Sequence, residues 1–152
     1  MTSPYIRPLT SDDYDQWRGL YQGYADFYHV ALTKDGVQTT WSWLIDDGHV
    51  CTGLVAEQQG QLVGFAHFLG MPSPLRGQVI GFLDDLFVVP DHRSCGAAAA
   101  LIKAVQAEAK AQGWGVVRWI TRDHNYRARG LYDKLAEKTD WVLYEMTEMA
   151  AK

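Results

Sequence analysis

The chain has 152 residues, of which 47% are hydrophobic and 21% are charged, and its formal net charge is −4. These proportions are those of a folded globular protein and exclude a disordered one. The length predicts a single domain over residues 1–152. No cluster of lysine and arginine follows the pattern of a nucleic-acid-binding surface, so no nucleic-acid partner is expected.

The cysteines and the N-terminal segment indicate the compartment. The two cysteines, Cys51 and Cys95, have no CxxC or Cys/His spacing, so neither a disulfide framework nor a zinc site is predicted. The five histidines show no metal-binding pairing, and no metal is expected. No secretion signal opens the chain, and no stretch is apolar enough to span a bilayer. We therefore expect a cytoplasmic protein that does not contact membranes.

The first third of the chain predicts a short strand and two helices. Residues 5–7 have the pattern of a strand, after which Thr10 or Ser11 can cap a helix. Aromatic and aliphatic side chains then recur at every third or fourth position as far as Tyr28, as on one face of an amphipathic helix. A second, shorter helix is predicted over residues 37–45.

Strand patterns begin after the second helix. Residues 50–56, 61–68 and 79–89 are rich in β-branched and aromatic side chains and are bounded by glycine and proline. Gln59 and Gly60 form a predicted hairpin turn between the first two of these strands. This part of the chain therefore predicts antiparallel pairing.

The last third of the chain alternates helix and strand patterns. A long helix over residues 94–112 is predicted to end at Gly113, because glycine is favoured directly after a helix. A buried strand over residues 116–121, a helix over 125–136 and a final strand over 141–146 follow. Antiparallel strands followed by this alternation predict a mixed α/β sheet.

One segment has the pattern of a phosphate-binding turn. The predicted strand that ends at Val89 runs into a turn with Arg93 and Gly96, and then into an alanine-rich helix. The first N–H groups of a helix lack intrahelical partners, and the helix dipole adds positive potential there. We therefore expect this turn to hold a phosphorylated cofactor. The alternative is that Arg93 and Gly96 only form a tight turn.

Two motifs and the order of the elements resemble the GNAT family, the acyl-CoA-dependent N-acetyltransferases. The first motif, Arg-x-x-Gly-x-Ala, is formed by Arg93, Gly96 and Ala98. The second is similar to Asn-x-x-Ala/Ser-x-x-Phe/Leu-Tyr and runs from Asn125 to Tyr132. The resemblance covers essentially the whole chain. It implies the α/β GNAT fold, with a mixed central sheet of about six to seven strands flanked by about four helices.

Within the family, the nearest likeness is to the group that contains spermidine/spermine (diamine) and thialysine acetyltransferases and the yeast Hpa2-like proteins. It rests on the acidic pair Asp84-Asp85, on the spacing of the second motif and on its Leu-Tyr-Asp-Lys-Leu-Ala ending. Ser94 and Ala136 depart from the family pattern, which often has glycine at both positions. Neither departure removes a reacting group.

The resemblance implies transfer of the acetyl group of acetyl-CoA to a primary amine of a small molecule, such as a polyamine, a diamine or an amino acid. The amine would attack directly in a ternary complex, with Tyr132 as the general acid for the departing thiolate. Asp84 would accept the proton of the amine or bind a second ammonium group. The expected acceptor contacts are Phe27, Tyr28 and Asp85. The expected acetyl-CoA contacts are Leu86, Phe87, Val88, Arg93, Ser94, Cys95, Gly96, Ala97, Ala98, Asn125 and Ala128.

Several of these residues have simpler interpretations. Tyr132 is otherwise a half-buried helix residue. Asp84 and Asp85 point to opposite faces of a regular strand, so one of them can be a solvated surface residue. Cys95 has the position of an activated thiol at a helix N-terminus, although the resemblance makes it a residue that only fills the loop.

Two other functions and the oligomeric state stay open. The acceptor could instead be a protein lysine or N-terminus, and the chain could instead be a non-catalytic acyl-CoA-binding regulatory module. The resemblance also implies a homodimer, in agreement with the apolar residues 141–144 near the C-terminus.

Overall fold

The computed structural model describes residues 3–148, and the chain divides into two compact units after Ile120. The first unit holds a mixed sheet in the order β1-β2-β3-β4-β5, antiparallel except for the parallel pair β4 and β5. Its strands are β1 (Tyr5–Pro8), β2 (Cys51–Gln58), β3 (Gln61–Ser73), β4 (Gln78–Val88) and β5 (Val117–Arg118). Its helices are η1 (Ser11–Asp13), α1 (Tyr14–Phe27), α2 (Lys34–Leu44), η2 (Pro90–His92) and α3 (Ala97–Gln112). The second unit holds α4 (Tyr126–Leu135).

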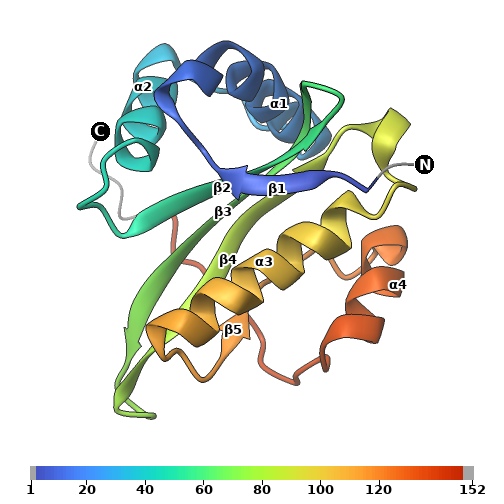
Figure 1. Ribbon diagram of the computed structural model, residues 1–152. Coiled ribbons are helices and arrows are strands. Elements are labelled where there is room, and N and C mark those ends of the chain that lie inside the picture. The colour runs from blue at the N-terminus through green and yellow to red at the C-terminus, as the bar shows by residue number, and fades with distance from the viewer. Residues whose placement is uncertain (1–2, 149–152) are drawn as a thin grey trace. The chain divides into compact units, whose positions relative to one another are not determined.

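The helices of the first unit cover both faces of the sheet, as Figure 1 shows, with α1 and α2 on one face and α3 on the other. Two glycines mark the close contacts. A Cβ atom on Gly64 of β3 would lie 3.4 Å from Leu101 of α3, and one on Gly23 of α1 would lie 3.0 Å from the Phe87 ring of β4. The face under α1 holds a buried cluster that includes Phe65 and Phe87. This layering confirms the predicted α/β fold.

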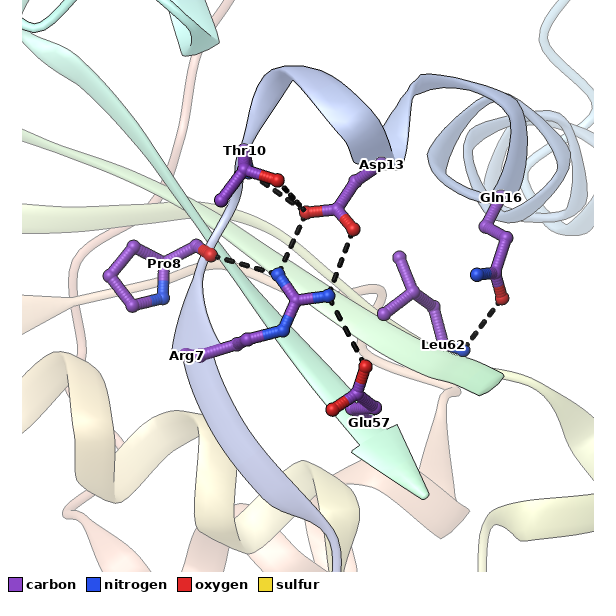
Figure 2. Close-up of polar contacts among 7 residues, drawn as sticks. All are labelled: Arg7, Pro8, Thr10, Asp13, Gln16, Glu57 and Leu62. Atoms are coloured by element: carbon purple, nitrogen blue, oxygen red, sulfur yellow. Dashed lines mark hydrogen bonds and ion pairs between the residues drawn. The ribbon is translucent and has the colours of Figure 1, made fainter. Parts of the chain in front are cut away.

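An ion pair joins the N-terminal strand to the start of the helical layer (Figure 2). Both guanidinium Nη atoms of Arg7 donate to the buried carboxylate of Asp13, at 2.8 and 2.9 Å. The same carboxylate accepts from the backbone N–H and the hydroxyl of Thr10. Arg7 also reaches Glu57 of β2 at 3.4 Å. These bonds tie β1, η1 and β2 together at one edge of the sheet.

Some predicted boundaries change for local reasons. The second helix begins at Lys34 because the Thr33 hydroxyl caps it by accepting from the Gly36 N–H at 3.0 Å. The long helix begins at Ala97 because Gly96 lies in the left-handed region with a φ of 84°. The hairpin turn at residues 59–60 is confirmed, since both of its residues have positive φ.

The expectation of six to seven strands is wrong for the described residues, which contain five. The predicted strand over residues 116–121 shrinks to Val117–Arg118, and the predicted final strand over residues 141–146 is absent. Its apolar pattern favours a strand, but β-propensity takes effect only where neighbours pair and pack with the segment. The side chains of residues 141–144 are between 62% and 89% exposed, so this segment lacks such packing.

The described helices include none that is both long and apolar enough to cross a membrane.

Candidate active site

The acidic pair of β4 lies at an irregularity in the pairing of β3 with β4. Phe68 pairs with Leu83 and His67 pairs with Asp85, which leaves Asp84 as the extra residue of a β-bulge. A bulge re-aims the side chains of a strand, so Asp84 and Asp85 need not point to opposite faces. Asp84 is open to solvent. Desolvation by the surrounding chain, followed by the charge of Asp85, nevertheless raises the pKa of Asp84 above its usual range.

Asp85 is held by side chains from α1 and β3. Nδ1 of His67 lies 2.8 Å from Oδ2 of Asp85, and the Tyr24 hydroxyl also hydrogen-bonds to this carboxylate. On the other side of the imidazole, the indole N–H of Trp17 donates to His67 Nε2 at 3.1 Å. Burial, with the charge of Asp85 adding to it, raises the pKa of Tyr24 far above its usual range. Tyr24 is therefore a neutral donor.

Cys51 completes the surroundings of the acidic pair from β2. Burial raises the pKa of the Cys51 thiol to about 11, and the charges of Asp85 and Asp84 act in the same direction. The thiol is thus protonated at neutral pH. Of the described residues, no group of three or more His, Cys, Asp or Glu could hold a metal ion.

The edge of β4 beside this pair is open. Among the described strands, β5 pairs with β4 only at Gly81 and Phe82, so the rest of β4 has no paired strand on that side. Backbone groups alternate between the two edges of a strand. Because the Val89 N–H donates to Val63 of β3, the N–H groups of Leu86 and Val88 face the open edge.

The three predicted contacts on β4 therefore differ in orientation. Leu86 and Val88 offer backbone N–H groups to a ligand that lies along the open edge. Phe87 turns its backbone toward β3, where it pairs with Phe65, and its ring is buried in the cluster under α1.

The predicted phosphate-binding turn has the geometry of an anion-binding helix start. The first intrahelical bond of α3 runs from the Ala100 N–H to the Gly96 carbonyl, so helix geometry leaves the N–H groups of Gly96, Ala97 and Ala98 outside the ladder. The left-handed φ of Gly96 shapes the turn, and a side chain there would be strained. These N–H groups can bind phosphate oxygens.

Arg93, Ser94 and Cys95 precede this helix start. The Arg93 Nε–H donates to the Val88 carbonyl at 3.2 Å, which ties the turn to the end of β4. The thiol of Cys95 donates to the His92 carbonyl at 2.8 Å, and its backbone N–H donates to the same oxygen at 3.2 Å. This favours a structural role for Cys95, and its N–H is already used.

The two predicted acceptor contacts at the end of α1 are brought to the turn. The guanidinium carbon of Arg93 lies 5.4 Å from the centre of the Phe27 ring, which is a cation–π contact. Phe27 packs edge-on against Tyr28 at 5.0 Å, and Tyr28 packs against Tyr24 at 5.1 Å. This aromatic row runs from Arg93 to Tyr24, the partner of Asp85.

The second unit presents its three predicted residues on one helix face. Asn125 directly precedes α4 and donates through Nδ2–H to the Thr121 hydroxyl at 3.1 Å. Ala128 and Tyr132 follow at spacings of three and four residues, which align side chains along a helix. Tyr132 is half-buried. Its role as a general acid stays a prediction.

The structure thus gathers the β4 pair, the turn and the end of α1, and it adds Trp17, Tyr24 and His67 to them. The sequence pattern indicates only that Trp17 and Tyr24 belong to the apolar face of a helix, and it gives His67 no metal-binding partner. Their spacing shows that Trp17 and Tyr24 share a face. Nothing in the sequence shows that this face lies against His67.

Comparison with known proteins then identifies the family. The sequence model of the acetyltransferase (GNAT) family matches residues 17–136. This chain belongs to the GNAT family. It is an acetyl-CoA-dependent N-acetyltransferase with the α/β fold of that family.

Two characterised relatives of this GNAT acetyltransferase differ in their acceptors. The D-amino-acid N-acetyltransferase HPA3 of Saccharomyces cerevisiae is 30% identical over 142 residues, which are 92% of this chain and 88% of the relative. The aminoglycoside N(6′)-acetyltransferase type 1 of Salmonella typhimurium is 27% identical over 91% of this chain and 95% of the relative.

Two solved structures have the same fold. The aminoglycoside N-acetyltransferase AAC(6′)-Iy in complex with CoA matches with a TM-score of 0.83 at 22% identity, covering 97% of each chain. The ribosomal-protein-alanine N-acetyltransferase of Brucella melitensis biovar Abortus matches with a TM-score of 0.79 at 27% identity, covering 96% of this chain and 99% of that one.

Proposed function

We propose that this GNAT acetyltransferase transfers the acetyl group of acetyl-CoA to a primary amine of a small cationic molecule. The observation that carries the proposal is the acidic pair Asp84-Asp85, which lies at a bulge beside the open edge of β4. A carboxylate pair attracts a cationic acceptor. The open edge offers N–H groups to the acyl donor. Acceptor and donor would thus meet at the same strand.

The part of the site that would bind acetyl-CoA is built from β4 and the turn that follows it. The pantetheine arm would pair with the N–H groups of Leu86 and Val88, and the pyrophosphate would bind at the start of α3 beside Arg93. Gly96 and the alanines after it allow the backbone to approach the phosphates closely. Ser94 remains a predicted contact on this side, whereas Phe87 turns its backbone to β3 and the N–H of Cys95 already donates to His92. Asn125 and Ala128 of the second unit also remain predicted contacts.

The reaction would proceed by direct attack in a ternary complex. Asp84 takes a proton from the acceptor ammonium, and the neutral amine then attacks the thioester carbonyl. A backbone N–H of β4 stabilises the oxyanion that develops. The new C–N bond forms and the C–S bond breaks as Tyr132 gives its proton to the departing thiolate. The second proton that the bonded nitrogen loses returns to the phenolate of Tyr132, and the proton on Asp84 passes to solvent.

The amine class follows from the relatives and from the charge of the site. HPA3 acts on D-amino acids and the Salmonella relative on aminoglycosides, according to their names. Both kinds of acceptor carry an ammonium group, as do the polyamines and diamines of the group that the sequence resembles. We therefore propose amino acids, diamines and aminoglycosides as the first acceptors to test, with Phe27 and Tyr28 lining their site.

One comparison favours a second candidate. The Brucella structure is named for the acetylation of a ribosomal-protein alanine, and it is 27% identical to this chain. The same donor site would then serve a peptide N-terminus. Turnover of peptides that exceeds turnover of every small amine would establish this candidate in place of the first one.

The test of the proposal is thiol release from acetyl-CoA with a panel of amines. We expect Tyr132→Phe to reduce kcat by about 10²- to 10⁴-fold, the range for the loss of a general acid. Tyr126→Phe is the matched control, because Tyr126 lies on the same helix and is 74% exposed. Equal turnover in the two variants would remove Tyr132 from the mechanism. Tight binding of acetyl-CoA without turnover of any acceptor would indicate the regulatory module instead.

We also propose that the protein is a cytoplasmic homodimer. The exposed apolar residues 141–144 support the dimer, because an exposed apolar patch commonly marks a contact surface.

A further inference from the structure

A buried chain of hydrogen bonds leads from α1 to the acidic pair. The indole N–H of Trp17 donates to Nε2 of His67, and Nδ1 of His67 lies 2.8 Å from the Asp85 carboxylate. An indole nitrogen can only donate, so Nε2 of His67 must accept and carries no hydrogen. The hydrogen of the neutral ring is therefore on Nδ1, where it is donated to Asp85. The two contacts together fix the tautomer of His67.

The surroundings hold the imidazole in this orientation. Trp17 has no exposed surface, and His67 is 2% exposed. The ring of Phe65 stacks on His67 at 4.4 Å, and the ring of Tyr21 lies 5.8 Å away. Rotation of the imidazole would leave buried polar atoms without partners, which is unfavourable in a buried site. A second proton on Nε2 would point at the N–H of Trp17.

Asp85 is the charged end of this series of hydrogen bonds, and its charge acts on the titratable groups around it. It receives one hydrogen bond from His67 and a second from the neutral hydroxyl of Tyr24. Its negative charge contributes to the raised pKa values of Tyr24, Cys51 and Asp84. These groups come from α1, β2 and β4, and His67 comes from β3. In this set, Asp84 is the one residue that is exposed to solvent.

We propose that Trp17 and His67 are positioning residues that hold Asp85 as a fixed anion, and that this anion makes Asp84 the carboxylate that takes the proton of the acceptor. The inference rests on the proposed function and divides the roles of the acidic pair. When two carboxylates lie together, the environment that separates their protonation assigns the acid and base roles. Here the hydrogen-bond donors His67 and Tyr24 contact Asp85, so Asp84 is the carboxylate that exchanges a proton with the acceptor.

The proton balance follows from this division. An acceptor ammonium group approaches two carboxylates, and its N–H bond breaks as an O–H bond forms on Asp84. The amine then has its lone pair for the attack on the thioester carbonyl. Asp85 remains negative throughout, because its partners already donate to it, and it attracts the next cationic acceptor.

The first experiment observes the hydrogen bonds of Trp17, His67 and Asp85 in the protein without any substitution. Two-bond ¹H–¹⁵N NMR of the ring of His67 in the wild-type protein should show a hydrogen on Nδ1 and an unprotonated Nε2 across neutral pH. A hydrogen on Nε2, or a ring protonated on both nitrogens, would overturn the proposal. This readout does not depend on finding the acceptor.

The second experiment compares Asp85→Asn with a matched control. The carboxyl ¹³C signal of Asp84 should titrate at lower pH in Asp85→Asn than in the wild type, because the neighbouring negative charge is gone. Asp35→Asn removes the same charge from an exposed site at the start of α2 and should leave that midpoint unchanged. Equal midpoints in the wild type and Asp85→Asn would overturn the proposal.

The third experiment links these hydrogen bonds to catalysis. In Trp17→Phe, the acid limb of kcat/KM against pH should move and kcat should fall, while KM for acetyl-CoA stays the same. A purely structural role would change both KM values or neither. Asp84→Asn tests the proposed function separately: full activity there would remove Asp84 as the base, whatever the NMR titration shows.

Discussion

At the residue scale, burial and charge decide which of several similar side chains can react. Asp84 and Asp85 are neighbours of the same chemical type, yet one is open to solvent and the other accepts from His67 and Tyr24. The same contrast separates Asp13 from the other acidic residues of the first helical turn. Its carboxylate is buried and bonded to Arg7 and Thr10.

The Arg7–Asp13 pair predicts a loss of stability in acid. The hydrogen bonds from Arg7, opposed by burial, lower the pKa of Asp13 from 3.8 to about 2. A carboxyl whose pKa is lower in the folded state stabilises that state above its unfolded pKa, and this contribution disappears as the pH falls toward 2. The full contribution is on the order of 2 kcal/mol at neutral pH.

Urea unfolding of the wild type and Asp13→Asn between pH 6 and pH 2 checks this prediction. We expect a free energy of unfolding that is lower in the variant at pH 6 and approaches that of the wild type as the pH falls through the interval from 3.8 to about 2. A difference between the two proteins that does not change with pH would contradict it.

At the element scale, local irregularities of β3 and β4 shape the molecule more than their regular pairing does. The bulge leaves Asp84 unpaired beside Asp85, and the short β5 pairs with β4 only at Gly81 and Phe82. At the far end of the same hairpin, two strand glycines make room for the ring of Trp114. A Cβ atom on Gly70 would lie 2.5 Å from this ring, and one on Gly81 would lie 2.9 Å from it.

We therefore expect Gly81→Ala to destabilise the protein by about 1–3 kcal/mol, the usual cost of overpacking. Gly19→Ala on α1 is the matched control, because a Cβ atom there meets nothing within 4 Å. Alanine is favoured over glycine inside a helix, so the control should be more stable by up to about 1 kcal/mol. Denaturation midpoints of the two variants provide the measurement. Similar midpoints would show that the ring of Trp114 does not occupy the space beside Gly81.

At the scale of the whole molecule, the segment over residues 141–146 has the composition of a strand but no strand partner in the described chain. Residues 141–144 are four consecutive exposed apolar side chains, and a contiguous patch of this kind commonly marks a contact surface. A second copy of the protein would cover them in the proposed homodimer.

Sedimentation of the wild type and Leu143→Glu tests the dimer. We expect the wild type to sediment as a dimer and the variant to shift toward the monomer, because a charge in an apolar contact is costly. Thr39→Glu adds the same charge at an exposed position on α2 and should remain dimeric. A monomeric wild type would refute the proposed dimer.

Local features were predictable from the sequence because neighbours in the chain determine them. The repeat of apolar residues in α1, the positive-φ turn at residues 59–60 and the glycine before α3 depend on spacing and backbone preference alone. The motif around Arg93 and Gly96 placed the chain in its family for the same reason. These features were sufficient for the fold class and the reaction.

The tertiary structure alone decided which residues surround the acidic pair. The pairing of His67 with Asp85 depends on a bulge, and the bond from Trp17 depends on the position of α1 over β3. Neither relation can be read from residue spacing, because the bonded residues lie 18 positions apart in the first case and 50 in the second. The missing final strand has the same cause, since a strand forms only where another strand offers its backbone groups.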